Sequence, residues 1–354
     1  MKKFTALALA LVLSLSLSSC GNNGTSFDDN SGSNSGDSAG KKQTINLVIG
    51  AGHTVGSMEY LDSLDNFFKP EVAKRVSENT DYEIEWTDAY GTVAGLSETV
   101  TATQDGLLDL CVITVSPVSG QLPYHQYSIY LPFCTGDNAL LQKVSDQLYE
   151  EFSDELVTSF ETQYNQKLLA KMVLDSYEIF SSTPIEKFSD LSGKKIGGSG
   201  RNLLWLENTG AVGIQSNMGD GYTSLQTGII DGTENNETAL TTGKHGEICK
   251  VYSTDQHAMI PDVMVISEKG WKNISPEDQQ IILEAAREST EQHKIAWDAA
   301  IDQAIEEAKT TMGVEFVNDV DKEAFREATS GMISDYCEQY PGVKKLLDII
   351  DSVE

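Results

Sequence analysis

Residues 191–236 constrain the fold more than any other stretch of this chain. A short β-type run leads into Gly197-Gly198-Ser199-Gly200, which predicts an open turn, and helical spacing follows over Asn202–Asn208. Asp220 can cap a second helix, and a further strand is predicted to begin at Ile229. Strands and helices that alternate in this order predict an α/β fold with a mostly parallel sheet, whose ligands bind at the carboxyl ends of the strands. We therefore expect this stretch to form half of a binding site.

We expect residues 44–170 to form the other half of the binding site. Strands are predicted at Thr44–Ile49, Tyr82–Trp86 and Leu108–Val115, with helices between them, so this region reads as a first α/β lobe. The loops at its strand ends offer three polar candidates to a cleft: His53, Thr92 and Thr114.

Residues 171–257 are predicted to form a second lobe, and its candidate pocket residues are Tyr177, Ser199, Arg201, Asn202, Trp205, Met218 and Asn235. Ser275 and Pro276 predict the start of a helix that could run to about Thr311. A helix of that length would brace both lobes, so we assign part of 258–300 to the first lobe and helices in 301–354 to the second. This fold class is a two-lobe clamp of the periplasmic-binding-protein kind, with hinged lobes that close over a small solute.

The first 20 residues predict a secretory signal peptide. Lys2 and Lys3 precede an apolar run that is shorter than the about 20 residues a membrane-spanning helix needs. The run ends in Leu17-Ser18-Ser19-Cys20, which resembles the bacterial lipobox and predicts lipidation of Cys20; an ordinary signal peptide is the alternative. Residues 21–43 are rich in Gly, Ser, Asn and Asp and predict a disordered tether. We therefore expect a protein anchored by lipid at the extracytoplasmic face of the cell membrane.

The net charge argues against one class of partner, and the spacing of the cysteines predicts neither a metal site nor a disulfide. The formal net charge of −29 is spread along the chain and argues against nucleic-acid binding. The other cysteines are far apart and include no CxxC pair, so neither a metal site nor a disulfide pairing follows from their spacing. They are Cys111, Cys134, Cys249 and Cys337.

Motifs for catalysis or cofactor binding were not found. G-x-G-x-x-G fails because Leu203 takes the place of the third glycine, and neither a P-loop nor a G-x-S-x-G sequence occurs. The five histidines have no metal-ligand spacing, and Asp231, Glu234 and Glu237 are interpreted as a solvated loop. We expect no cofactor, no metal and no enzymatic activity.

The most specific pattern is the sequence YTSLQTGIIDGTEN at residues 222–235. It resembles the Y-x-A-L-Q-x-G-x-x-D-G-x-E-N pattern of the DctP-type solute-binding proteins of tripartite ATP-independent periplasmic (TRAP) transporters. The resemblance extends from about Thr44 to the C-terminus. It implies lobes that exchange strands, capture of a small organic acid, and delivery to a small and a large membrane subunit in uptake driven by an ion gradient.

Two arginines of the family have no counterpart here, and in many members one of them binds the ligand carboxylate. The resemblance places Gly197 and Tyr177 at or near their positions, so we expect Arg201 to be the anion partner, or a cyclic or aromatic solute to be held by hydrogen bonds and stacking. Asn235 is the pocket residue that the motif carries over most directly. The sequence leaves two other functions open, a solute-binding protein of an ATP-driven importer and a surface-anchored enzyme acting on an organic acid.

Overall fold

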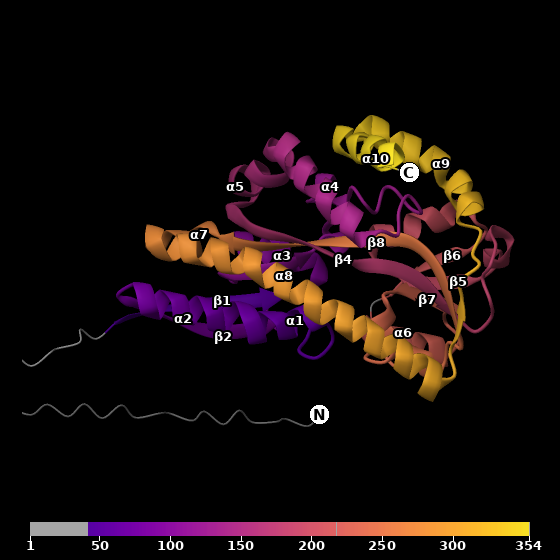
Figure 1. Cartoon of the computed structure of the whole chain (residues 1–354), viewed down its shortest axis with the longest axis horizontal. Helices are drawn as coiled ribbons and strands as arrows, with labels where there is room; N and C mark the ends of the chain where they lie inside the picture. Colours follow the sequence, from indigo (N-terminus) through magenta and orange to yellow (C-terminus); the bar gives the residue numbers. More distant parts are fainter. Residues whose placement is uncertain (1–41, 217, 354) are drawn as a thin grey trace, which may run out of the picture. The chain divides into compact units, whose positions relative to one another are not determined.

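The computed structural model describes residues 42–216 and 218–353. The signal peptide, Cys20 and nearly all of the predicted tether lie outside these residues. Figure 1 shows the strands and helices. The strands are β1 (Gln43–Ala51), β2 (Tyr82–Tyr90), β3 (Leu110–Thr114), β4 (Gln166–Ser181), β5 (Lys195–Gly198), β6 (Val212–Gln215), β7 (Gly232–Asn235), β8 (Val251–Ser267) and β9 (Glu315–Val317). The α-helices are α1 (Glu59–Ser63), α2 (Lys69–Asn79), α3 (Thr99–Gln104), α4 (Asn138–Glu151), α5 (Ser159–Tyr164), α6 (Met218–Gln226), α7 (Glu268–Lys272), α8 (Pro276–Glu307), α9 (Lys322–Gln339) and α10 (Pro341–Val353).

All described strands belong to one mixed sheet with the order β2-β1-β3-β8-β4-β7-β5-β6, and β9 pairs with β8. β1 runs parallel to β2 and β3, and β5 runs parallel to β6 and β7. β4 and β8 are antiparallel partners in the middle of the sheet. We call the part of the sheet that consists of β1, β2, β3 and the adjoining ends of β4 and β8 the first half. The second half consists of β5, β6, β7, β9 and the opposite ends of β4 and β8.

The two long strands pass from one half to the other. Strand β4 is continuous over Gln166–Ser181, and β8 is continuous over Val251–Ser267. Their ladder is interrupted only locally, by register shifts at 168/170, 173/176 and 177/179 of β4. Bulges of this kind bend a strand without ending it. The strands therefore bend where the two halves meet.

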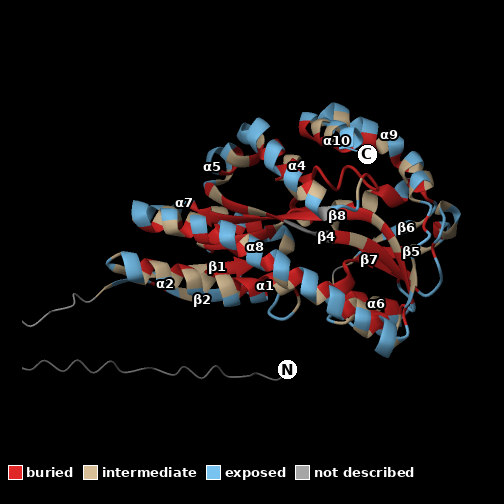
Figure 2. Cartoon of the chain, viewed as in Figure 1, coloured by how far each residue is buried: buried red, intermediate tan, exposed pale blue. Residues whose placement is uncertain are grey.

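Helix α8 contacts elements of both halves, as predicted. The Ser275 hydroxyl accepts the Asp278 N–H at 3.1 Å, and Pro276 occupies the first turn. Buried side chains such as Ile282, Trp297 and Ile301 recur along one face of the helix. That face packs against α1 and α2 of the first half and against residues 237–240 of the second (Figures 1 and 2). A π-helical turn at Ala308–Met312 follows, so the predicted end near Thr311 is confirmed.

Local structure in residues 191–236 departs from the prediction in four places. Gly197 and Gly198 belong to strand β5, and the helix after them is a 3-10 helix, Gly200–Asn208. The glycines are held in the sheet because β5 pairs with β6 on one side and β7 on the other. Helix α6 begins at Met218, so Asp220 lies in its first turn and does not cap it, and β7 begins at Gly232, not at Ile229.

Figure 2 shows that most of the sheet is buried, and its first half forms the largest apolar cluster.

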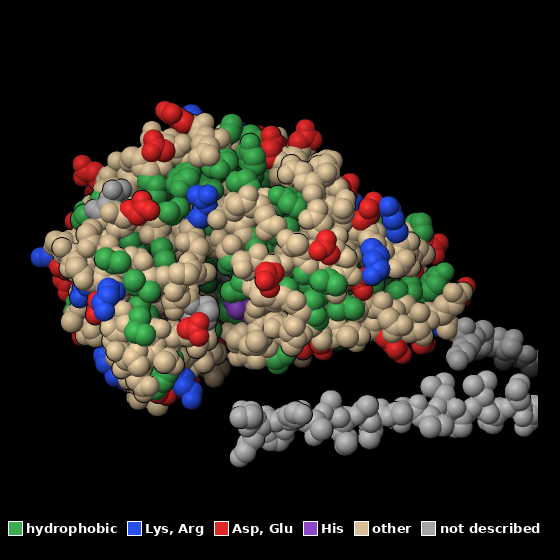
Figure 3. Space-filling model, turned by 180° about the vertical axis from the view of Figure 1, so that it is seen from behind, with side chains coloured by type: hydrophobic (Ala, Val, Ile, Leu, Met, Phe, Trp, Pro, Cys, Tyr) green, Lys and Arg blue, Asp and Glu red, His purple; other side chains and the backbone are tan. Residues whose placement is uncertain are grey.

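Cys111, Cys249 and Cys337 are free thiols, so the four cysteines form no disulfide with one another. Within the described residues, no helix has the length and apolar character needed to cross a membrane. Acidic side chains are scattered over the face in Figure 3 and do not gather in one patch.

Candidate functional site

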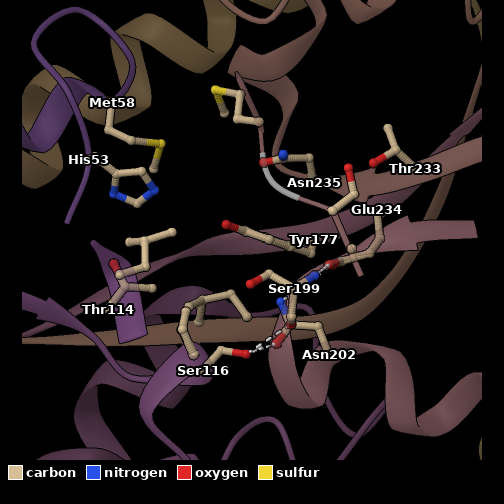
Figure 4. A pocket seen from close by; sticks show the side chains of 16 residues that line it. His53, Met58, Thr114, Ser116, Tyr177, Ser199, Asn202, Thr233, Glu234 and Asn235 are labelled. Carbon is tan, nitrogen blue, oxygen red and sulfur yellow. Dashed lines mark hydrogen bonds between the residues drawn. The ribbon is translucent and has the colours of Figure 1, made fainter. Parts of the chain in front are cut away.

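A cavity lies where the two halves meet, at the carboxyl ends of β3, β5 and β7 and in the loop after β1 (Figure 4). Ligands of parallel α/β sheets bind at these strand ends. The cavity is lined by His53, Met58, Leu96, Thr114, Ser116, Pro117, Tyr177, Gly198, Ser199, Asn202, Ser216, Met218, Thr233, Glu234, Asn235 and Ile260. Its volume is about 50 Å³, whereas small-molecule pockets measure roughly 300–1,000 Å³. A solute of ordinary size therefore requires the halves to separate or their side chains to move.

Glu234 is the acidic residue of the lining. Its side chain is buried, and Oε1 accepts the backbone N–H of Ser199 at 3.1 Å. The Asn202 amide lies 3.4 Å from Oε2. Burial raises the pKa of the Glu234 carboxyl, and the contact with His257 opposes that rise. The cavity wall of the second half thus carries a carboxyl group that protein donors hold in place.

Behind Glu234 lies a buried row of ionisable groups. His257 Nε2 is 3.4 Å from Glu234 Oε2, and His257 Nδ1 is 2.8 Å from Asp255 Oδ2. Burial alone would lower the pKa of His257, but the flanking Asp255 and Glu234 outweigh it and raise the pKa to about 9. The other Asp255 oxygen accepts the Ile179 N–H at 3.0 Å. The row therefore connects the cavity wall to both long strands.

The first half contributes neutral polar groups. His53 Nδ1 lies 3.0 Å from the Tyr60 hydroxyl, and burial lowers the pKa of His53 to about 4. Thr114 donates to Asp262 Oδ2 at 3.2 Å, and burial raises the pKa of Asp262 well above its usual value. At neutral pH His53 is therefore uncharged.

One set of contacts joins the halves across the cavity. The Ser116 hydroxyl lies 2.8 Å from Asn202 Oδ1 and 3.1 Å from the Ser199 carbonyl oxygen. Gly200 has φ of +58°, and a Cβ there would lie 2.6 Å from the Ser116 carbonyl oxygen. A side chain at Gly200 would thus press the two halves apart.

Seven of the ten predicted pocket residues line this cavity: His53, Thr114, Tyr177, Ser199, Asn202, Met218 and Asn235. The other three lie elsewhere. Thr92 is exposed in the loop after β2. Arg201 donates to the Tyr336 hydroxyl at 3.2 Å and lies over the ring of Tyr130, so its guanidinium faces away from the cavity. Trp205 is buried, with its ring 4.9 Å from that of His257 and 5.1 Å from that of Phe133.

The sequence interpretation missed Glu234. Glu234 and Glu237 are buried, and Asp231 accepts the Lys195 N–H at 2.8 Å, so these residues are not a solvated loop. The signal was present, since Glu234 adjoins Asn235 in the same motif. In the part of the chain that the structure describes, no cluster of His, Cys, Asp and Glu side chains could hold a metal ion.

Comparisons with known proteins agree on one family. Residues 63–339 match the family described as bacterial extracellular solute-binding protein, family 7. An uncharacterised protein of Salmonella typhimurium is 32% identical over 244 residues, which cover 67% of this chain and 72% of that protein. The 2,3-diketo-L-gulonate-binding periplasmic protein of Escherichia coli is 29% identical over 63% of this chain and 68% of its own length.

A solved structure extends the likeness to the fold. A TRAP periplasmic solute-binding protein from Pseudomonas putida, crystallised with D-glucuronate, is 27% identical. It has a TM-score of 0.75 and covers 88% of this chain and 98% of its own.

Proposed function

This chain belongs to family 7 of the bacterial extracellular solute-binding proteins, the binding subunits of TRAP transporters, and from that premise we propose that it captures a small organic acid. It delivers the acid to the small and large membrane subunits of a TRAP transporter. The observation that supports this function best is a cavity whose polar lining comes from both halves of the sheet. The relative from Pseudomonas putida holds D-glucuronate, and that from Escherichia coli is named for 2,3-diketo-L-gulonate.

We propose that the two halves act as hinged lobes. The first comprises 44–170 with part of 258–300, and the second comprises 171–257 with 301–354. The register shifts of β4 support a hinge there, and the small cavity volume supports an open state that admits the solute.

A calorimetric titration tests the binding function. D-Glucuronate, D-galacturonate and other small organic acids are added to the purified protein, and we expect one or more of them to bind saturably at one site. The ligand is then recovered and analysed, because a binding protein returns it unchanged whereas an enzyme yields a product. Turnover of the bound acid would contradict our proposal that the chain is not an enzyme.

We further propose that the protein is anchored by lipid on Cys20 at the extracytoplasmic face of the membrane. The sequence Leu17-Ser18-Ser19-Cys20 after a basic and apolar segment supports this. Replacement of Cys20 by Ala should move the protein from the membrane fraction to the soluble exported fraction, and Ser19→Ala serves as the control. A parent protein that is already soluble would refute the anchor.

A further inference from the structure

We propose that the solute carries a protonated amino group, which Glu234 receives, so that the ligand is a zwitterionic acid of the amino-acid kind. This inference rests on the proposed capture of an organic acid and narrows the class of acid.

The cavity offers no positive charge to a carboxylate. No lysine or arginine is among its described lining residues. His53 is neutral at pH 7, since burial lowers its pKa to about 4. Arg201, the cation nearest in sequence to Ser199 and Asn202, is directed toward Tyr336 and Tyr130. A simple anion would therefore enter a buried site without a charged partner, which is unfavourable at low dielectric.

The buried row behind the wall does not supply the missing charge. His257 holds a proton at neutral pH because its pKa is raised to about 9, but Asp255 and Glu234 both flank it. One imidazolium thus faces two carboxyl groups. The row carries more acidic than basic groups and favours a positive charge in the cavity beside it.

Glu234 retains capacity to accept hydrogen bonds. An ionised carboxylate has about four acceptor sites. The Ser199 N–H uses one at 3.1 Å, while His257 and the Asn202 amide approach at the longer distances of 3.4 to 3.5 Å. An ammonium group has three donors and fits this arrangement.

The opposite wall suits the acidic end of such a solute. Figure 4 shows His53 and Thr114 across the cavity from Glu234. His53 is neutral and uses Nδ1 toward the Tyr60 hydroxyl at 3.0 Å, which leaves its second ring nitrogen for another partner. A carboxylate placed at this end lies as far as the cavity allows from Glu234.

Matched pairs of solutes test the inference. Calorimetry at pH 7 compares serine with glycerate and glutamate with 2-hydroxyglutarate, and D-glucuronate represents hydroxylated acids without an amine. In at least one pair we expect the amino member to bind at least tenfold more tightly than its hydroxy counterpart. Glu234→Gln keeps the shape of the side chain and the bond from the Ser199 N–H but removes the charge. The ratio of the affinity for the amino member to that for the hydroxy member should therefore fall toward one. Glu268→Gln, which removes an exposed carboxylate paired with Lys272, should leave it unchanged.

The outcomes separate the two proposals. Equal or tighter binding of the hydroxy members, or of D-glucuronate alone, overturns the inference and keeps the organic-acid function. An unchanged ratio in a folded Glu234→Gln protein also overturns it. If that variant does not fold, the ratio measured on the parent protein decides. Binding of no acid of either kind contradicts the organic-acid function as well.

Discussion

At the scale of single residues, the row Asp255, His257 and Glu234 determines how the site responds to pH. The three side chains are buried, and their contacts are 2.8 Å and 3.4 Å long. Removal of one member of a buried ionic group leaves the others uncompensated, which commonly costs about 3–5 kcal/mol. His257 is therefore expected to stabilise the fold as long as it stays protonated.

The pH dependence of stability should show this directly. The pKa of His257 rises from 6.5 to about 9 in the folded protein. Its contribution is then fully present below pH 6.5 and is lost as the pH rises through 9, with a total of about 3 kcal/mol at about 1.36 kcal/mol per pKa unit. Urea unfolding of the parent and of His257→Gln should differ most below pH 6.5, and the difference should shrink toward pH 9.

His125 provides the matched control, because its shift has the opposite sign. Burial lowers the pKa of His125 to about 3, so its contribution is present above pH 6.5 and is lost as the pH falls toward 3. His125→Gln should therefore alter the profile on the acid side and leave the slope between pH 6.5 and 9 as in the parent. A slope in that window that His257→Gln does not change would contradict our assignment.

The place of a residue in the cavity lining could be predicted where an element ends in a loop, but not where the direction of a side chain decides it. His53, Thr114 and Asn235 could be predicted because each stands at a strand end. Arg201 and Asn202 are neighbours, yet only Asn202 lines the cavity. The sequence predicted an α-helix there, whereas the 3-10 helix has about three residues per turn, which changes the direction of each side chain. The local sequence does not indicate which of these two helix types forms.

At the scale of elements, α8 was predictable and the long strands were not. The sequence Ser-Pro-Glu-Asp at 275–278 and the apolar stripe that follows are local signals for a helix. The continuity of β4 and β8 depends instead on pairing between residues that are far apart in sequence, such as Lys171 with Val263. The same holds for Gly197 and Gly198, which read locally as a turn. Both pair with β6 in the structure, and Gly197 also pairs with β7.

The N-terminal cap of α8 should have a measurable effect on stability. The Ser275 hydroxyl accepts the Asp278 N–H at 3.1 Å and donates to the carboxylate of the same residue at 2.7 Å. Ser275→Ala should lower the free energy of unfolding by about 1 kcal/mol. Thr290→Ala, at a half-buried position of the same helix away from the cap, should cause no loss, since alanine has the higher helix propensity. Equal urea midpoints for Ser275→Ala and the parent would show that the cap contributes nothing.

At the scale of the whole molecule, binding is expected to depend on movement of the two halves. The crossing strands β4 and β8 connect them with register shifts in between. Side chains from both halves enclose a volume of about 50 Å³, which is too small for a sugar acid at its full size. We therefore assign the contacts of Ser116 with Asn202 and Ser199 to the closed state of the proposed hinge, and we expect a more open state to admit the solute.

Gly200 is the position at which closure can be tested with one substitution. Its φ of +58° makes alanine strained, and a Cβ would lie 2.6 Å from the Ser116 carbonyl oxygen across the cavity. Gly228 has φ of +70°, and a Cβ added there would meet no atom within 4 Å, so it carries the strain without the clash. Gly200→Ala and Gly228→Ala should each lose about 1–2 kcal/mol of folding stability from backbone strain. Only Gly200→Ala should weaken solute binding, by at least tenfold, because it opposes closure.

Small-angle X-ray scattering completes this test. Saturating solute should reduce the radius of gyration of the parent and of Gly228→Ala as the halves close, whereas Gly200→Ala should keep the larger value at the same solute concentration. Since the two variants share their backbone strain, a difference between them isolates the contact with Ser116. Equal affinities for the two variants, or a parent whose radius does not change on binding, would mean that the halves do not close over the solute.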